Sequence, residues 1–233
     1  MIQTVFKRVE KKYLLTEEQY NNLLKSCSKY IKEDEFGLHT VCNIYYDTNN
    51  FELIRNSIEK PAYKEKVRLR SYDTPEGDTK VYLELKKKYD GIVYKRRVTM
   101  PLTEAMKCLE NKKIDKDDQI SKEINYVLNH YNLEPKLYLA YDRQAYYSKE
   151  SDDLRITFDT NIRSRMEDVD LSLGDAGELL FDKKYYLMEV KTASSMPMWF
   201  VKVLDEFNIY PTSFSKYGSI YKKLLKKGKI LYV

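Results

Sequence analysis

The sequence is poor in the residues that build disulfide frameworks and histidine-rich metal centres. Its three cysteines, Cys27, Cys42 and Cys108, are isolated from one another, and no CxxC pair occurs. An odd number of scattered thiols suits a reducing cytosol better than a disulfide scaffold. The two histidines, His39 and His130, also stand alone. These shortages argue against a disulfide-stabilised secreted domain and against a site built mainly from histidine.

Glycine, proline and long apolar runs are scarce as well. Only 7 glycines and 6 prolines occur among 233 residues, and they mark no linker, repeat or low-complexity segment. We therefore expect a single domain over residues 1–233. No segment approaches the roughly 20 apolar residues of a transmembrane helix, and the start MIQTVFKRVEKKY lacks the apolar core of a signal peptide. The sequence thus predicts a cytoplasmic protein.

Charge and tyrosine are what the sequence does contain. Charged residues make up 33% of the chain, hydrophobic residues make up 42%, and 22 residues are tyrosine, so a sizeable core can form. The net charge of +5 is only mildly basic and does not identify an anionic partner. The positions of the charges must therefore carry the functional argument.

The segment KEKVRLRSYD, residues 64–73, places a cation at every second position. Lys64, Lys66, Arg68 and Arg70 alternate with apolar or uncharged residues over most of its length. In a β-strand this spacing puts four cations on one face. Because like charges along one face repel, the groups that lie opposite them decide what this segment does.

Periodicity and turn residues predict an α+β protein with about eight strands. Hairpin turns in DTPEGD and YDG and the capping pattern Thr16 to Gln19 support the assignment. Strands are expected at 4–15, 38–48, 63–72, 79–88, 91–100, 136–148, 154–164 and 184–192, with a weak one near 178–181. Helices are expected at 16–31, 49–58, 102–110, 117–131, 196–207 and 213–227.

Each long strand carries its charges on one face and its apolar residues on the other. The many helices need an apolar surface to pack on, so the charged faces are expected to point inward. A closed barrel achieves this without leaving strand edges. The sequence therefore predicts an eight-stranded antiparallel β-barrel tunnel with a polar, cationic lumen, flanked by helices. Buried cations need anionic partners, and phosphate suits arginine best.

Four acidic residues fall on the same charged faces: Glu10, Glu84, Asp159 and Glu189. They suit plain salt bridges to the neighbouring lysines and arginines. Glu189, in MEVK, also suits a Mg²⁺ or Mn²⁺ ion, since such ions bind through one or two carboxylates plus substrate phosphates. The sequence leaves both interpretations open.

Nine segments, in order, resemble the polyphosphate polymerase (VTC) domain of the triphosphate tunnel metalloenzyme, or CYTH-like, superfamily. They extend over nearly the whole chain: RVEKKYLL, YYDT, KVRLRSY, YLELKKK, YKRRV, YDRQAY, LRITFDT, LMEVKT and SFSKYGSIY. Each segment is weak alone, but their shared order is specific. The family fold is an eight-stranded antiparallel barrel that forms a tunnel, with a C-terminal helix near the tunnel mouth, in agreement with the inward cations inferred above.

The resemblance implies roles for individual residues. The catalytic set is Arg68, Arg70, Lys86, Lys216 and Glu189. The metal ligands are Glu189 and Glu10, which would hold Mn²⁺ or Mg²⁺. The residues that bind phosphate are Lys12, Lys95, Arg97, Tyr141, Arg143, Arg155, Lys191 and Ser215.

Two departures from the family pattern matter. Cyclase and triphosphatase relatives carry Glu-x-Glu-x-Lys in the first strand, whereas this chain has Arg8-x-Glu10-x-Lys12. The change resembles the polymerase branch and argues against a full acidic metal cluster. The eukaryotic polymerase pattern also has a lysine where this chain has Ser213, so one phosphate contact and full processivity are in doubt.

The resemblance implies a metal-dependent transfer of the γ-phosphoryl group of ATP to polyphosphate or pyrophosphate, with product passing to a membrane protein partner at the inner face of a membrane. No Walker A motif is present. The alternatives are an inorganic triphosphatase on the same fold, or a non-catalytic module that binds polyphosphate or inositol phosphates. Single-stranded nucleic acid binding would require exposed aromatics beside the cations, and we expect no nucleic acid partner.

Overall fold

The computed structural model describes residues 9–151, 153–193 and 195–230, which form an α+β protein with a ten-stranded sheet. The hydrogen-bonded order of its main strands is β1-β10-β8-β7-β3-β4-β5-β6, while β2 pairs with β7 and β9 pairs with β8. The paired strands whose register is described are all antiparallel. The sheet is not closed in the described part of the chain. An eight-stranded barrel is therefore not confirmed. The sheet has ten strands because it also includes the short β2, which was not predicted, and the short β9, which was predicted only as a weak strand near 178–181.

The chain forms two compact units, each assembled from several segments. Unit 1 contains residues 1–39, 141–162 and 181–215, and unit 2 contains residues 40–140, 163–180 and 216–233. The expectation of one domain over residues 1–233 is not tested by this division, because β7 (Glu134–Ser148) and β8 (Leu154–Arg165) each contribute residues to both units.

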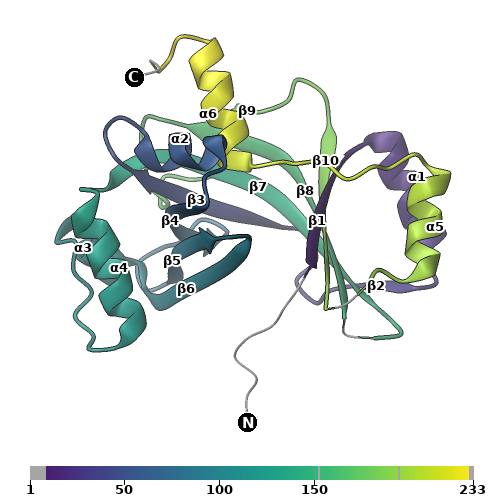
Figure 1. Cartoon of the computed structure of the whole chain (residues 1–233), viewed down its shortest axis with the longest axis horizontal. Coiled ribbons are helices and arrows are strands. Elements are labelled where there is room, and N and C mark those ends of the chain that lie inside the picture. The colour runs from purple at the N-terminus through teal and green to yellow at the C-terminus, as the bar shows by residue number, and fades with distance from the viewer. Residues whose placement is uncertain (1–8, 152, 194, 231–233) are drawn as a thin grey trace. The chain divides into compact units, whose positions relative to one another are not determined.

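In unit 1, two helices cover the apolar face of a group of strands (Figure 1). Tyr13, Met188 and Phe158 come from three of the strands and pack in one core cluster with Leu23 and Phe200 of the helices. The strands are β1 (Val9–Thr16), β10 (Tyr185–Thr192), β8, the second part of β7 and the short β2 (Ile31–Glu33), and the helices are α1 (Glu17–Cys27) and α5 (Met198–Glu206). The charged face of these strands therefore lies opposite the helices.

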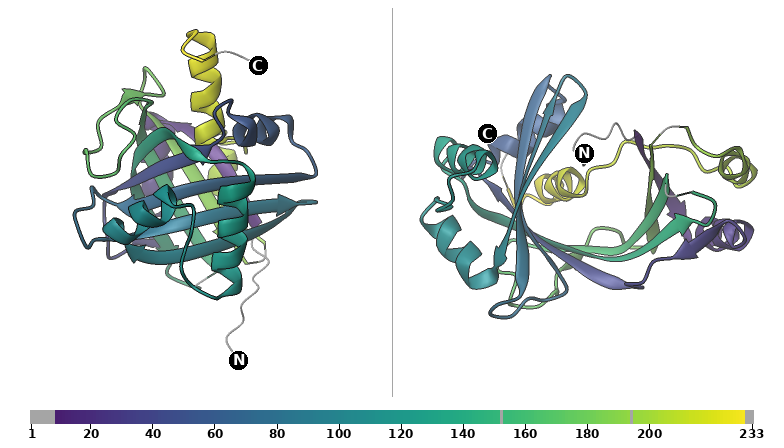
Figure 2. Two further views of the ribbon diagram at one scale, coloured as in Figure 1. Left: turned by 90° about the vertical axis from the view of Figure 1, so that its left-hand side faces the viewer. Right: turned by 90° about the horizontal axis from the view of Figure 1, so that it is seen from below.

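Unit 2 repeats this arrangement with its own core. Leu69, Leu83 and Val98 of neighbouring strands pack with Leu109 and Ile124 of the covering helices. The left view of Figure 2 shows the teal helices in front of these strands. The strands are β3 (His39–Asp47), β4 (Tyr63–Tyr72), β5 (Lys80–Tyr89), β6 (Ile92–Pro101) and β9 (Glu178–Leu179). The helices that contribute to this core are α2 (Glu52–Glu59), α3 (Leu102–Glu110) and α4 (Gln119–His130). The remaining helix of unit 2, α6 (Lys216–Lys226), contributes no residue to this core cluster, and its Tyr217 ring stacks on Tyr45 of β3.

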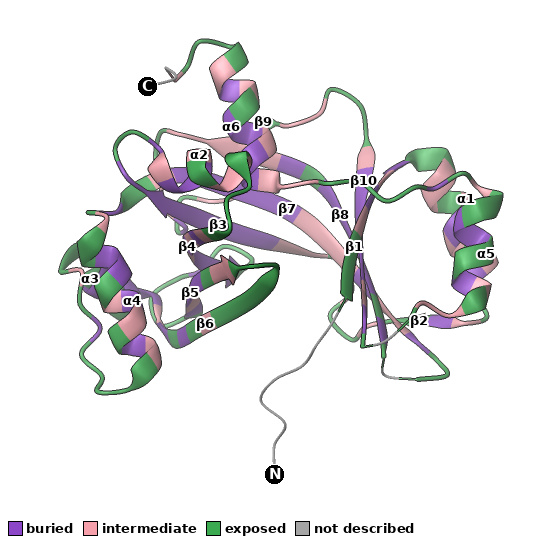
Figure 3. Ribbon diagram, viewed as in Figure 1, coloured by how far each residue is buried: buried purple, intermediate pink, exposed green. Residues whose placement is uncertain are grey.

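The burial pattern follows the period of two that the sequence predicts. Val81, Leu83 and Leu85 of β5 are fully buried, whereas Lys86 between β4 and β6 is exposed. Figure 3 shows the same division on α3 and α4, whose buried residues form one stripe and whose exposed residues form the other. None of the helices in the described ranges is long and apolar enough to cross a membrane.

Local signals explain where several elements begin. Thr16 accepts a hydrogen bond from the backbone of Gln19, and the Gln19 side chain accepts one from the backbone of Thr16, which confirms the predicted capping box of α1. Asp90 and Gly91 both have positive φ angles, 44° and 81°, as a two-residue hairpin turn requires. The first predicted strand begins at residue 4, but residues 4–8 lie outside the described part.

Candidate functional site

One face of β4, β5 and β6 in unit 2 is almost entirely cationic. The strand register aligns its residues in rows, and Glu84 is the one acidic residue among them in these three described strands. We call this surface the cationic face. Its charged members are Lys64, Lys66, Arg68, Arg70, Lys80, Glu84, Lys86, Lys88, Lys95 and Arg97.

The strand register shows which residues lie opposite the cations of β4. Lys66 is directly opposite Lys86, and Lys86 is directly opposite Lys95, so three lysines form one row across three strands. Lys64 is likewise opposite Lys88. Like charges in directly opposed positions destabilise a sheet. The repulsion within this row is reduced by a bound anion, so the row suits an anionic ligand.

Glu84 lies between Arg68 and Arg97 in the next row and pairs with the cations around it. Its carboxylate lies 2.7 Å from the Arg68 guanidinium, 2.6 Å from the Lys95 ammonium and 4.0 Å from Arg70, and it accepts a 2.7 Å hydrogen bond from Arg97. Burial opposes ionisation of Glu84, but Arg68, Arg70 and Lys95 together hold the pKa of its carboxyl well below the usual value. Glu84 is thus a salt-bridge partner, the role that the sequence suggested for it.

Two residues that the sequence reasoning did not assign complete the cationic face. Asn43 Oδ1 accepts a 3.0 Å hydrogen bond from Arg70, and the Tyr45 hydroxyl lies 3.4 Å from Arg68. Both belong to β3 and lie directly opposite these arginines. Period two along 38–48 would have placed Asn43 and Tyr45 on one face, but only the register shows that this face adjoins Arg68 and Arg70.

In unit 1, acids and bases alternate on the charged face of β1, β10 and β8. One row is Glu10, Lys191 and Arg155, and the next is Lys12, Glu189 and Thr157. Lys191 lies 3.5 Å from Glu10. We call this group, with Arg143 and Asp159, the acid–base cluster. Its mixed charge contrasts with the single sign of the cationic face.

Lys12 is the centre of the acid–base cluster. Its ammonium lies 3.4 Å from Glu189 and 3.6 Å from Glu10, and it donates a 3.2 Å hydrogen bond to the carbonyl oxygen of Phe214. The structure thereby brings the first strand next to the segment that ends in Ser215. Lys216, the next residue, is the first residue of α6. Arg8 lies outside the described residues, so its expected position in the first strand is untested.

Arg143 is held from two sides within unit 1. It makes a bidentate salt bridge to the buried Asp159, at 2.6 and 2.8 Å, and lies 3.7 Å from Glu189. Its guanidinium also lies 5.1 Å from the centre of the Tyr141 ring. Arg155 of β8 is more exposed than Arg143 and lies 3.9 Å from Asp34. Asp159 therefore acts as a salt-bridge partner that orients Arg143.

The acid–base cluster offers few protein ligands for a divalent cation. No three histidine, cysteine, aspartate or glutamate side chains among the described residues are grouped so that they could hold a metal by themselves. Glu10 and Glu189 are nevertheless joined by Lys12, and the buried hydroxyl of Thr157, opposite Glu189, has no hydrogen-bond partner in the described part. This donor set fits an ion that takes most of its ligands from phosphate and water.

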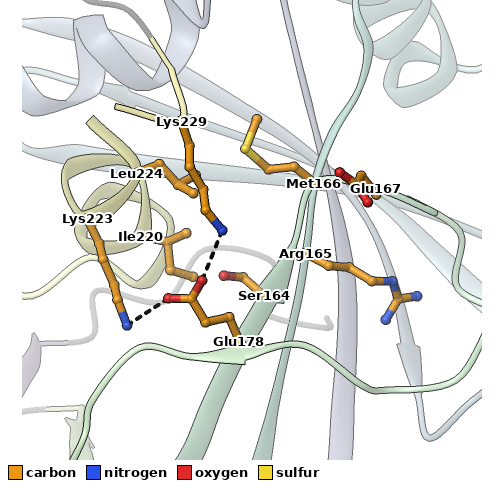
Figure 4. Close-up of a pocket in the computed structure, with 9 residues that line it drawn as sticks. All are labelled: Ser164, Arg165, Met166, Glu167, Glu178, Ile220, Lys223, Leu224 and Lys229. Carbon is orange, nitrogen blue, oxygen red and sulfur yellow. Dashed lines mark hydrogen bonds and ion pairs between the residues drawn. The ribbon is translucent and has the colours of Figure 1, made fainter. Parts of the chain in front are cut away.

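A separate cavity of about 530 Å³ lies in unit 2 between α6, β9 and the end of β8 (Figure 4). None of the residues predicted to bind phosphate or metal line it. Glu178 points toward Lys223 and Lys229 in Figure 4, and hydrogen bonds from Lys227, Lys229 and Lys223 lower its pKa to about 2. These ion pairs connect α6 and the residues that follow it to Glu178 of β9.

The predicted site residues thus fall into two groups, one in each unit. Unit 2 holds Arg68, Arg70, Lys86, Lys95, Arg97 and Lys216, and unit 1 holds Glu10, Lys12, Tyr141, Arg143, Arg155, Glu189, Lys191 and Ser215. Within each unit the strand register brings most of them together. Thr157, Asn43 and Tyr45 are the additions that the structure makes.

One family model and two solved structures are similar to this chain. The family model described as "VTC domain" matches residues 7–225. A structure from Bacillus halodurans described as a "putative adenylate cyclase" is 17% identical, with a TM-score of 0.56, and the match covers 89% of this chain and 93% of the other. A second with the same description, from Vibrio parahaemolyticus, is 14% identical with a TM-score of 0.52, covering 96% and 99%. At these identities the likeness concerns the fold alone. No curated protein matches the chain.

Proposed function

The chain belongs to the VTC domain family, and from this premise we propose that it is a polyphosphate polymerase. It would transfer the γ-phosphoryl group of ATP to the end of a growing polyphosphate chain or to a short primer such as pyrophosphate. That the phosphates lie inside a tunnel, as the resemblance implies, is part of this proposal, as is a membrane protein that receives the product.

The observation that carries the proposal is the row Lys66, Lys86 and Lys95 on the cationic face. Nine cations of the described strands β4, β5 and β6 share this face with one carboxylate, Glu84. Repulsion between directly opposed lysines costs stability, and a bound polyanion removes that cost. Polyphosphate carries a negative charge on every phosphate, so it matches a surface on which cations recur along and across the strands.

Phosphoryl transfer needs positioning and charge neutralisation more than covalent chemistry from the protein. Arg68 and Arg97 already place their guanidinium groups around one carboxylate, at hydrogen-bond distance. A phosphate has the same preference for bidentate arginine contacts. We assign these arginines, with Lys86 and Lys95, to hold the phosphate oxygens on which charge develops.

The acid–base cluster supports a role for Mn²⁺ or Mg²⁺. Glu189 and Glu10 would hold the ion, which when bound neutralises charge on the phosphate oxygens. Lys12 lies between these two acids and keeps their charges balanced. Arg143 is fixed by Asp159, with its second contact at Glu189, so its guanidinium is oriented before any ligand arrives.

Hydrolysis of triphosphate is the main alternative reaction. The described residues contain no group of three acids able to hold a metal, whereas each acid of the acid–base cluster is matched by a cation. This balance supports binding of an anionic chain over activation of water by an acidic metal cluster. Polymerisation is therefore the reaction that the charges support best.

Product analysis tests the reaction directly. The full chain is incubated with ATP and Mn²⁺ or Mg²⁺, with and without pyrophosphate, and the products are separated on a gel stained for polyphosphate. We expect long chains to accumulate, and R68A/R70A to abolish them. Orthophosphate without chains would identify a triphosphatase. Tight binding of tripolyphosphate with no turnover, unchanged in E189Q, would identify a binding module.

Lys86 offers a test that separates a binding role from a structural one. In K86Q the repulsion from Lys66 and Lys95 is relieved, so the free energy of unfolding should stay constant or rise by up to about 1 kcal/mol. Tripolyphosphate affinity should fall about tenfold, as expected when one charged contact of roughly 1.4 kcal/mol is lost. Calorimetry and chemical denaturation measure the two effects.

The matched control is a lysine outside the cationic face. Lys122 is exposed on α4, where it pairs with Asp117, and K122Q removes the same charge. It should leave tripolyphosphate affinity within twofold of the wild type. Equal losses in K86Q and K122Q would mean that only net charge matters and that the cationic face is not a specific site.

A further inference from the structure

The hairpin between β5 and β6 ends in a patch of exposed apolar side chains. Tyr89 pairs with both Tyr63 and Ile92 across the strands, and Tyr94 of β6 lies on the same face. Val93 lies between Ile92 and Tyr94 in sequence and is on the opposite face, where it pairs with Lys88. These five side chains are between 43% and 58% exposed. We call them the hairpin tip. Large apolar side chains grouped on an otherwise polar surface indicate a contact site.

The hairpin tip is held in one shape by its turn and its neighbours. Asp90 and Gly91 form the turn with positive φ angles, and the Asp90 backbone donates a 3.0 Å hydrogen bond to the carbonyl oxygen of Ala62. The Tyr63 hydroxyl bonds to the buried Glu65, and the Tyr63 and Tyr89 rings lie 6.5 Å apart. Because the patch is preformed, a partner would not have to order it.

Cations are adjacent in sequence to these apolar side chains, and by the period of two their side chains lie on the opposite face of the strands from the tyrosines and Ile92. Lys64 follows Tyr63, Lys88 precedes Tyr89, and the two lysines are opposite each other in the register. Lys60 is close enough to Lys64 to affect it electrostatically. Asp90 in the turn is the acid nearest the end of the hairpin. Tyrosines at the rim of an apolar tip, with lysines next to them, form the pattern found at membrane–water interfaces.

We propose that the hairpin tip docks the protein onto an anionic lipid bilayer. Ile92 and Val93 would enter the boundary between headgroups and acyl chains, the tyrosine rings would lie at headgroup depth, and Lys60, Lys64 and Lys88 would contact anionic headgroups. This docking differs from recruitment by a membrane protein. It shares Lys64 and Lys88 with the cationic face, so Y89S/I92S, which changes side chains outside that face, is the variant that separates docking from the proposed polymerase activity.

Exposed tyrosines beside lysines also meet the condition stated above for single-stranded nucleic acid binding. The aliphatic residues favour the bilayer. Nucleic acid binding proteins use aromatic rings because every base has a flat face for stacking, and isoleucine and valine lack such a surface. Burying Ile92 and Val93 in a bilayer instead removes apolar area from water.

Vesicle sedimentation tests the proposal with the full chain and phosphatidylcholine vesicles, with and without phosphatidylserine. We expect binding to the anionic vesicles that weakens with added salt. Y89S/I92S should lower the partition coefficient at least tenfold, and K64Q/K88Q should lower it mainly on anionic vesicles. The matched control F36S/L38S removes two exposed apolar side chains of unit 1 and should bind as the wild type does.

A fluorescent label on the hairpin tip tests whether this part of the protein enters the bilayer. The three native cysteines are buried, so Ile92→Cys can be tagged with a polarity-sensitive dye. Its emission should shift to the blue with anionic vesicles, while a dye at Leu38→Cys should not respond. Unchanged sedimentation of Y89S/I92S, an equal loss in F36S/L38S, or binding of oligothymidylate rather than vesicles through the hairpin tip would each overturn the proposal. Denaturation curves confirm that the variants are folded.

Discussion

Lys95 has a charge that changes close to neutral pH. Burial of its ammonium lowers its pKa to about 8, although the adjacent Glu84 counteracts the effect. Under the proposed function, the protonated ammonium present below this pH would attract phosphate oxygens, and the neutral amine present above it would not. We therefore expect the dissociation constant for tripolyphosphate to increase as the pH rises through about 8, measured by calorimetry.

Arginine at the same position isolates this effect. Its guanidinium stays charged throughout this range, so K95R should bind tripolyphosphate with a flatter dependence on pH. Both proteins experience the same ionisation of the ligand, so the difference between their curves belongs to residue 95. Parallel curves would exclude Lys95 as a phosphate contact.

Thr157 is the other residue with a specific expectation. A buried hydroxyl without a partner costs stability, so T157V should leave the free energy of unfolding constant or raise it by about 1 kcal/mol. If the hydroxyl donates to a phosphate oxygen beside Glu189, T157V should weaken tripolyphosphate binding several-fold while T157S retains it. Loss of stability in T157V with unchanged affinity would assign the hydroxyl to the fold.

Among the elements, α4 is attached to the sheet by one acid. Glu123 accepts hydrogen bonds from Arg96 of β6 at 3.1 Å, Lys87 of β5 at 3.1 Å and Gln119 of α4 at 3.2 Å. Partial burial opposes ionisation of Glu123, but these three contacts lower its pKa to about 2. The pair of basic side chains on the outer face of β5 and β6 is thus neutralised by a helix.

The pKa of Glu123 predicts how stability depends on pH. A carboxyl with a lowered pKa stabilises the fold above its unfolded pKa of about 4.3, and loses this contribution as the pH falls toward 2. E123Q should lower the free energy of unfolding by about 2 kcal/mol at neutral pH. Its melting temperature should also decrease less steeply in acid than that of the wild type.

The exposed Glu110 of α3 provides the comparison for this measurement. E110Q removes the same charge without breaking a described ion pair, so its melting temperature and acid profile should follow the wild type. If E110Q and E123Q behave alike, the attachment of α4 depends on apolar packing and not on this acid.

Element types were predictable because each depends on short-range patterns. The prediction of 102–110 matches α3 (Leu102–Glu110), and most strand boundaries differ from the structure by one or two residues. The helix expected over 16–31 instead ends at Cys27, and Ile31–Glu33 forms β2 by pairing with β7. Its partner lies more than a hundred residues away, so local periodicity could not reveal it.

For the molecule as a whole, the cationic face predicts stabilisation by polyanions. A ligand that binds only the folded state at 100 times its dissociation constant adds about 2.7 kcal/mol to the free energy of unfolding. Tripolyphosphate should therefore raise the melting temperature of the wild type, and R68A/R70A should lose most of this increase. Sodium chloride of equal ionic strength serves as the control, and an equal increase with it would mean that general screening is responsible.

The division into two units could not be predicted from the sequence. Every long strand shows the same alternation of charged and apolar residues, so the sequence does not indicate that the charged faces form two separate groups. The structure separates it into the cationic face, with one acid among its members, and the acid–base cluster, where each acid meets a cation. The expected closed barrel of eight strands is likewise not confirmed by the described residues.

The sequence by itself determined which face of each strand is charged, because side chains alternate with a period of two whatever the strand pairs with. It therefore placed Lys66, Lys86 and Lys95 on polar faces and Leu83 and Met188 in the cores. Only the tertiary structure decided which charges are opposite one another, because register depends on pairing between distant segments. That register makes Lys86 a neighbour of two lysines and makes Lys12 the link between Glu10 and Glu189.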